Sequence, residues 1–196
     1  MIILLNIVKH WVQPLKNKLL IFDLDETLTH GSEHPLERPA DFQTEKFYIY
    51  ERPHVRELIN FCRIHFALAI WTTATPDYAK SILQHMLDAD LNEYFEFIWC
   101  RDRCTFRGTN SDGESRWIKD LKKVKNVGWN LDHILVVEDK PENISRHYGN
   151  VIRISPFEGD PADMELKRLM PFLLSLKLAE NVRMIEKRGW QNRFHI

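Results

Sequence analysis

The chemically most informative segment of the sequence has two aspartates, two residues apart, directly after a short apolar run. The run is Leu19–Phe22, and Asp23 and Asp25 follow it. A carboxylate can attack a phosphate ester at phosphorus and form an acyl phosphate. A second carboxyl group nearby can donate a proton to the leaving oxygen and later accept one from water. We therefore expect Asp23 to be a nucleophile and Asp25 to be a general acid and base.

Other polar residues could offset the repulsion between an anionic nucleophile and an anionic phosphate. A hard divalent cation binds carboxylate and phosphate oxygens together. Glu138 and Asp139 supply carboxylates for such a cation beside Asp23. The hydroxyl of Thr72 and the amine of Lys119 could bind the phosphoryl oxygens. Together these residues predict a magnesium-dependent site for phosphoryl transfer.

Each of these residues, taken alone, also has a structural explanation. Aspartate often caps a helix, and most lysines are solvent-exposed. The segment Glu138–Pro141 would by itself be a turn and a helix start. The case for a site depends on these side chains following separate strands of one sheet.

Five short apolar runs predict those strands. Each is four to six residues long, which is typical of strands that are buried on both faces. The runs are Leu19–Phe22, Phe66–Trp71, Phe95–Trp99, His133–Val137 and Val151–Ile154.

Helical patterns lie between the predicted strands, and alternation of the two favours an α/β fold with a parallel sheet. Ligands of such sheets bind beyond the carboxyl ends of the strands. Lys119 lies near the start of the third predicted helix, and Pro171 is expected to interrupt or kink the last. The helical patterns are Pro53–Cys62, Pro76–Met86, Trp117–Val124, a segment that starts at Pro141, and Met164–Leu178.

Two segments depart from this alternation. His30–Glu51 contains Phe47–Tyr50, an expected strand or hairpin, and Arg101–Arg116 is a polar loop or β-hairpin insertion. Both are short, so we expect no full lid and an open active site. The insertion could bind a phosphorylated substrate through arginines or could be a solvated loop, and the sequence leaves both readings open. These arginines are Arg101, Arg103 and Arg107.

The segment Asp23–Leu28 resembles the first motif of the haloacid-dehalogenase-like (HAD) phosphatases. Further matching segments, in the same order along the chain, are similar to the carboxy-terminal-domain phosphatases of RNA polymerase II, the Fcp/Scp-like or NLI-interacting-factor-like branch. These segments are Arg52–Val55, Trp71–Thr73, Tyr78–Ala79, Cys104, Lys119–Leu121 and Asp139–Pro141.

The resemblance implies a Rossmann-like HAD fold, in which helices flank a central parallel sheet with a small β-hairpin insertion and no large cap domain. It also implies Mg²⁺ as cofactor, with the main-chain carbonyl of Asp25 among its ligands. Glu138 would be an additional ligand or would support the others. The implied catalytic residues are Asp23, Asp25, Thr72 and Lys119; the phosphate-binding residues are Thr72, Thr73 and Lys119; the metal ligands are Asp23, Asp25, Asp139 and Glu138.

The bulk composition sets limits on class and location. The 196 residues favour one domain over 18–183, with an extension at 1–17 and a tail at 184–196. A net charge of −1 gives no sign of a nucleic-acid or membrane surface. The apolar segment Met1–Val8 is too short to span a bilayer and is expected to be an edge strand or a helix packed on the core. Three cysteines fit a reducing cytoplasm, or a nucleus in a eukaryote.

The predicted function is a monomeric, Mg²⁺-dependent phosphatase with an aspartyl-phosphate intermediate, acting on phosphoserine or phosphothreonine in proteins or peptides. The alternatives are a phosphatase for a small phosphate ester or a polynucleotide terminal phosphate, and a non-catalytic binding module. Asp25 argues against a dehalogenase, which generally lacks that carboxylate. A phosphomutase needs a lid that excludes water, and the sequence contains no segment large enough.

Overall fold

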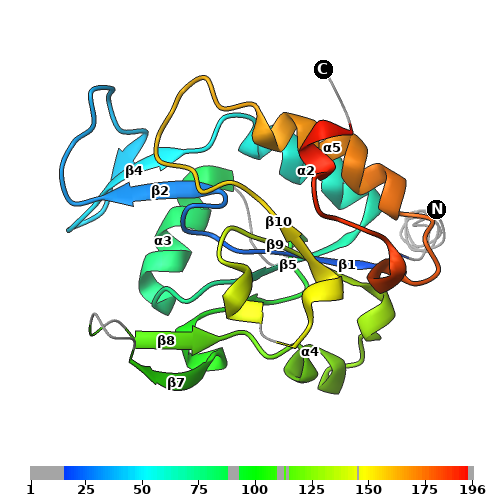
Figure 1. Cartoon of the computed structure of the whole chain (residues 1–196). Coiled ribbons are helices and arrows are strands. Elements are labelled where there is room, and N and C mark those ends of the chain that lie inside the picture. Colours follow the sequence, from blue (N-terminus) through cyan, green and yellow to red (C-terminus); the bar gives the residue numbers. More distant parts are fainter. Residues whose placement is uncertain (1–15, 88–92, 110–112, 114, 145, 194–196) are drawn as a thin grey trace, which may run out of the picture.

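The centre of the molecule is a five-stranded parallel sheet with the strand order β10-β9-β1-β5-β6 (Figure 1). The computed structural model of the chain describes residues 16–87, 93–109, 113, 115–144 and 146–193. The prediction of an α/β fold with a parallel sheet is confirmed, and β1 lies in the middle. The strands are β1 (Leu19–Phe22), β5 (Ala67–Trp71), β6 (Ile98–Trp99), β9 (Ile134–Glu138) and β10 (Val151–Arg153).

The three central strands are buried on both faces of the sheet. Every residue of β1, β5 and β9 is buried. Because successive side chains of a strand point to opposite faces, Leu20 and Phe22 join the apolar cluster on one face, and Leu19 and Ile21 join the cluster on the other. This two-sided burial explains why the strands are uninterrupted apolar runs.

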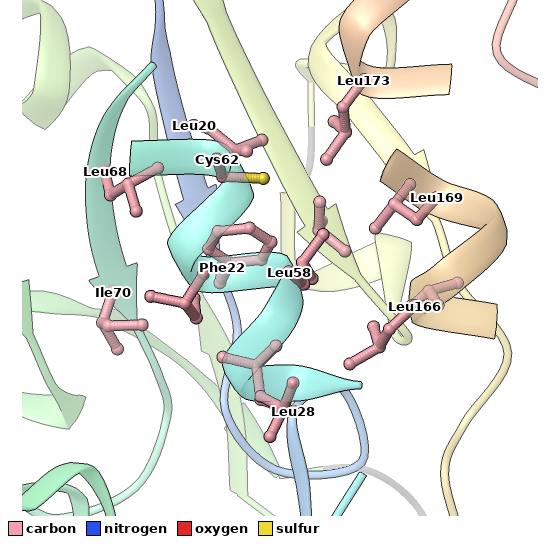
Figure 2. Packing of buried hydrophobic residues seen from close by; sticks show 14 of the residues in the cluster. Leu20, Phe22, Leu28, Leu58, Cys62, Leu68, Ile70, Leu166, Leu169 and Leu173 are labelled. Atoms are coloured by element: carbon pink, nitrogen blue, oxygen red, sulfur yellow. The ribbon is translucent and has the colours of Figure 1, made fainter. Parts of the chain in front are cut away.

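Helices cover both faces of the sheet (Figure 1). Figure 2 shows side chains of α2 and α5, among them Leu58 and Leu169, gathered with Phe22 of β1. On the other face Val124 of α4 packs with Leu19 in the second cluster. The helices are α2 (Val55–His65), α3 (Pro76–Leu87), α4 (Lys122–Asn126) and α5 (Glu165–Leu176).

Two small antiparallel sheets stand at one end of the central sheet (Figure 1). One is three-stranded, with the order β2-β4-β3, and the other is the β7–β8 hairpin. The expected strand at Phe47–Tyr50 is therefore present as β4, and the expected hairpin insertion is present as well. Their strands are β2 (Thr29–Ser32), β3 (Phe42–Gln43), β4 (Tyr48–Glu51), β7 (Thr105–Thr109) and β8 (Ser115–Ile118).

The third helix predicted from the sequence is wrong over its first half. Trp117 and Ile118 belong to β8, where they pair with Phe106 and Thr105 of β7. α4 begins only at Lys122. Apolar spacing in so short a segment fits a strand or a helix, and pairing with a neighbouring strand decides between them. Lys119 therefore lies in the loop between β8 and α4.

Two smaller predictions also differ from the structure. β6 includes only the last two residues of the predicted run Phe95–Trp99, and Pro141 opens a short 3₁₀ turn that ends at Ile144. Pro171 lies inside α5 without ending it. The segment Met1–Val8 lies outside the described residues. Among the described residues, no helix has the length and apolarity needed to cross a bilayer.

The loop between β10 and α5 contacts the connection between β2 and β3 through Gly159, and this contact can be tested. Gly159 has φ +95°, and a Cβ atom there would overlap Leu36 Cδ1. Its carbonyl accepts a hydrogen bond from Arg38 Nε at 3.0 Å. We expect Gly159→Ala to lower the free energy of unfolding by about 2 kcal/mol, measured by urea denaturation.

Gly128→Ala is the matched control for Gly159→Ala. Gly128 has φ +108°, but no atom lies within 4 Å of the position that its Cβ would take. This substitution adds backbone strain without overlap, so a smaller loss is expected. Equal losses in the two variants would mean that contact with Leu36 contributes nothing.

Candidate active site

The polar residues that follow β1, β5 and β9 meet at the carboxyl ends of these strands, as predicted. The amide of Asp23 donates to the carbonyl of Val137 at 3.0 Å, and the amide of Thr72 donates to the carbonyl of Trp99 at 2.9 Å. Glu138 is the last residue of β9. The hydrogen-bond pattern of the sheet thus continues into these residues and fixes the backbone from which their side chains project.

Lys119 brings a buried cation to the two acidic strand ends. Its side chain is fully buried, and its Nζ lies 2.7 Å from Asp23 Oδ1 and 2.7 Å from Glu138 Oε2. Burial lowers the pKa of Lys119, but the charges of Asp23 and Glu138 raise it by more, so the pKa lies above the ordinary value. Its amide donates to the carbonyl of Asn143 at 2.7 Å, which fixes the backbone of the loop. The amine is therefore a permanent positive charge beside Asp23.

Glu138 uses both of its carboxylate oxygens within the protein. Oε2 accepts from Lys119 Nζ, and Oε1 accepts from Asn143 Nδ2 at 3.2 Å. Burial, and after it the charge of Asp23, raises the pKa of Glu138 well above its ordinary value. These contacts suit a side chain that holds Lys119 in place.

Asp139 is the carboxylate best suited to bind a cation with Asp23. Its Oδ1 accepts from Thr27 Oγ1 at 3.4 Å, whereas its buried Oδ2 has no hydrogen-bond partner within the described part of the chain. Burial and then the charge of Asp23 raise the pKa of Asp139 to about 6. One oxygen each from Asp23, Glu138 and Asp139 lies within 4.8 Å of the others. Buried carboxylate oxygens without a donor fit a hard cation such as Mg²⁺.

Asp25 has the environment of a group that exchanges protons. Burial and then the negative charge of Asp23 raise the pKa of Asp25 to about 6, while a hydrogen bond with Tyr78 opposes this rise. Thr72 Oγ1 donates to Asp25 Oδ2 at 3.3 Å and accepts from the amide of Ala74 at 3.0 Å. The hydroxyl of Thr72 is thus engaged with Asp25, and its contact with a phosphoryl oxygen stays a prediction.

Thr73 follows Thr72 directly after β5. It lines a groove that also includes Asp25. Its carbonyl accepts a hydrogen bond from Arg101 Nε at 2.7 Å. Among the three arginines for which the sequence left two readings open, Arg101 therefore lies next to the site.

Sequence reasoning missed three residues that contact the predicted site. Tyr78 contacts Asp25 from α3; the sequence placed it in a helical pattern and in a segment that resembles the family, without assigning it a role. Thr27 donates to Asp139 and lies within the motif that begins at Asp23, a signal that could have identified it. Asn143 approaches from a 3₁₀ turn and carried no signal in the sequence.

Arg52 binds the loop that follows β1 through hydrogen bonds. Its buried guanidinium donates to both carboxylate oxygens of Asp163, at 3.1 and 2.8 Å. It also donates to the carbonyls of Thr27 at 3.2 Å and Ser155 at 2.9 Å. A planar guanidinium can bind several acceptors at fixed angles. Arg52 thereby positions Thr27, whose hydroxyl contacts Asp139.

Relatives of the chain share both its sequence pattern and its fold. A CTD small phosphatase-like protein 1 from Caenorhabditis elegans is 28% identical over 82% of this chain and 32% of its own. A CTD nuclear envelope phosphatase 1B from Danio rerio is 26% identical over 89% of this chain and 73% of its own. The chain spans about a third of the length of the first curated relatives it matches.

The fold matches a solved structure of fission yeast RNA polymerase II CTD phosphatase Fcp1 bound to beryllium fluoride. The TM-score is 0.64 at 15% identity, over 90% of this chain and 66% of the other. Residues 18–183 match the family described as NLI interacting factor-like phosphatase. The chain therefore belongs to the NLI interacting factor-like phosphatases, within the HAD-like superfamily.

Proposed function

We propose that the chain hydrolyses phosphate monoesters through an aspartyl-phosphate intermediate on Asp23, with Mg²⁺ as cofactor. The observation that carries the proposal is the buried amine of Lys119, 2.7 Å from the nucleophilic carboxylate. Fixed positive charge next to a carboxylate lowers the repulsion that an incoming phosphate would meet. The membership of the chain in a family of phosphatases supports the same chemistry.

Each residue of the site would have a separate role in the reaction. Asp23 attacks phosphorus, and Lys119 neutralises charge on the nucleophile and the phosphoryl group. Asp25 donates a proton to the leaving oxygen and then accepts one from the water that cleaves the acyl phosphate. A carboxyl group with a pKa near 6 can hold or release that proton near neutral pH.

The cation would be held by the side chains of Asp23 and Asp139 and by the main-chain carbonyl of Asp25. When bound, Mg²⁺ would offset the negative charge that the carboxylates and the phosphate bring together. Thr72 would orient Asp25 through the hydrogen bond described above and, with Thr73, would bind the phosphate.

Phosphoserine or phosphothreonine in a protein or peptide is the proposed substrate. The names of relatives support it, because one solved neighbour is an RNA polymerase II CTD phosphatase. The two small β-sheets beside the site also support it, since neither is a full lid domain. A small phosphate ester or a polynucleotide terminal phosphate would enter the same site. Turnover of phosphopeptides, sugar phosphates and nucleotides by one preparation separates these substrates.

The remaining assignments also stay proposals. The extent of the family match supports a phosphatase domain at residues 18–183, and a monomer is the proposed oligomeric state. The cytoplasm is the proposed compartment. The names of several relatives, which include nuclear envelope phosphatases, support a nuclear-envelope alternative. Microscopy of the fluorescently tagged chain distinguishes the two.

Removal of the metal tests the proposal directly. With p-nitrophenyl phosphate as substrate, we expect turnover in Mg²⁺, a fall of at least about a hundredfold after treatment with EDTA, and recovery when Mg²⁺ is restored in excess. Release of p-nitrophenolate is the measurement. Undiminished turnover in EDTA would refute the metal dependence. Absence of turnover for every phosphate ester, with retained binding, would favour a non-catalytic module.

A further inference from the structure

A groove of about 1020 Å³ leads away from the catalytic residues. Asp25 and Thr73 line one part of it, and other walls come from β2, the β3–β4 turn and the start of α3. A peptide whose phosphorylated residue reaches Asp23 must place neighbouring residues near these walls. The groove would therefore contact the residues that flank the phosphorylated residue and could discriminate between them.

The walls of this groove carry more negative than positive charge. Outside the catalytic residues, the described part of the chain contributes four carboxylates to the lining and two cations, Lys46 and Arg101. Glu26 pairs with His30 at 2.9 Å. Glu33, Glu45 and Asp77 are exposed, and within the described residues they have no ion-pair partner. The groove thus offers three carboxylates that a ligand could pair with.

Glu45 lies on the turn between β3 and β4, which two hydrogen bonds hold in place. The amide of Thr44 donates to the carbonyl of Phe47 at 2.9 Å, and the amide of Phe47 donates to Thr44 Oγ1 at 3.0 Å. These two bonds close the loop that carries Glu45 and Lys46. Asp77 has a structural explanation as well, since a carboxylate in the first turn of α3 is favourable. Glu45 is therefore the clearer test residue.

Two of the arginines near the groove already have partners within the protein. Arg101 donates to the carbonyl of Thr73, and its guanidinium lies 5.8 Å from the ring of Trp117. Arg103 lies 4.6 Å from the ring of Trp99 and does not line the groove. Arg101 and Arg103 thus lie on the side of the β7–β8 hairpin, whereas Lys46 lies beside Glu45 on the β3–β4 turn and leaves the groove with more carboxylates than cations.

We propose that this groove makes the enzyme selective for phosphopeptides with lysine or arginine next to the phosphorylated residue. This inference rests on the proposed phosphatase function. Complementary charge across an interface favours one partner and disfavours partners of like charge. Because the carboxylates are exposed, the selectivity is moderate and weakens as salt is added.

Three phosphoserine peptides of equal length, with flanks of lysine, alanine or glutamate, test the proposal. We expect kcat/KM, from phosphate release at low salt, to be about tenfold higher for the lysine peptide than for the glutamate peptide. Glu45→Lys combined with Glu33→Lys should abolish or reverse this order. Glu180→Lys, an exposed change outside the groove, should keep it. Turnover of p-nitrophenyl phosphate should be equal in all the proteins.

The outcomes separate this inference from the proposed function. Equal kcat/KM for the three peptides, or an order that the double variant leaves unchanged, overturns the charge selectivity while p-nitrophenyl phosphate is still hydrolysed. A preference for the glutamate peptide would also overturn the proposal. It would indicate that arginines of the insertion bind the residues that flank the phosphate. If the wild type hydrolyses nothing, the phosphatase proposal fails. Fluorescence anisotropy of the same labelled phosphopeptides then tests the selectivity by affinity alone.

Discussion

The variant Asp23→Asn is expected to lose at least about a thousandfold in kcat for p-nitrophenyl phosphate, because an amide cannot form the acyl phosphate. The substitution preserves the shape of the side chain, and an amide oxygen can still contact the Lys119 amine. Stability should not fall. The charge of Asp23 raises the pKa of both Asp25 and Asp139, so its removal relieves repulsion among the carboxylates. Thermal unfolding in the absence of metal measures this second effect.

The control for Asp23→Asn is the same change at an exposed aspartate. Asp102 lies in the 3₁₀ turn Arg101–Arg103, and Asp102→Asn should retain full activity. Rapid acid quench of the wild type with a radiolabelled phosphate ester should trap label on the protein in a base-labile bond. Full activity of Asp23→Asn, or equal trapping in that variant, would remove Asp23 from the role of nucleophile.

Lys119→Met is expected to damage both folding and catalysis. Asp23 and Glu138 would face each other in a buried site without the cation that lies 2.7 Å from each. Removing one partner of a buried charge cluster costs about 3–5 kcal/mol of unfolding free energy. Activity should fall by at least about a hundredfold, since the positive charge at the nucleophile is lost. Urea denaturation and p-nitrophenyl phosphate turnover measure the two effects separately.

A second substitution shows whether the loss of stability comes from uncompensated charge. Glu138→Gln added to Lys119→Met removes one of the two carboxylates that have lost their cation. The double variant should therefore be more stable than Lys119→Met alone. Lys122→Met, at an exposed position in α4, should change neither stability nor activity. If the double variant is the less stable of the two, Lys119 acts through packing and not through charge.

The sequence predicted the position of Asp23 at the end of β1 well, for a physical reason. β1 is buried on both faces, so its residues form an apolar run with a sharp end, and Asp23 is the first polar residue after it. The same holds for Thr72 after β5. Strand ends of this kind place polar groups at one edge of a parallel sheet, whatever the loops beyond them do.

The surroundings of these residues depended on tertiary contacts that periodicity does not encode. Trp117 and Ile118 have spacing that fits a helix, yet pairing with β7 makes them a strand and moves Lys119 into a loop. Tyr78 lies at a position typical of a helix core, although its hydroxyl bonds Asp25. Asn143 contacts Glu138 only because a 3₁₀ turn folds back over the strand end.

The location of Lys119 directly after β8 connects the β7–β8 hairpin to Asp23 through a single residue. The strand ends at Ile118, and the next residue carries an ammonium group that lies 2.7 Å from Asp23 Oδ1. A displacement of β7 and β8 would therefore move the backbone of Lys119, whose amide donates to the carbonyl of Asn143. Contacts made with the insertion would in this way change the electrostatic field at Asp23.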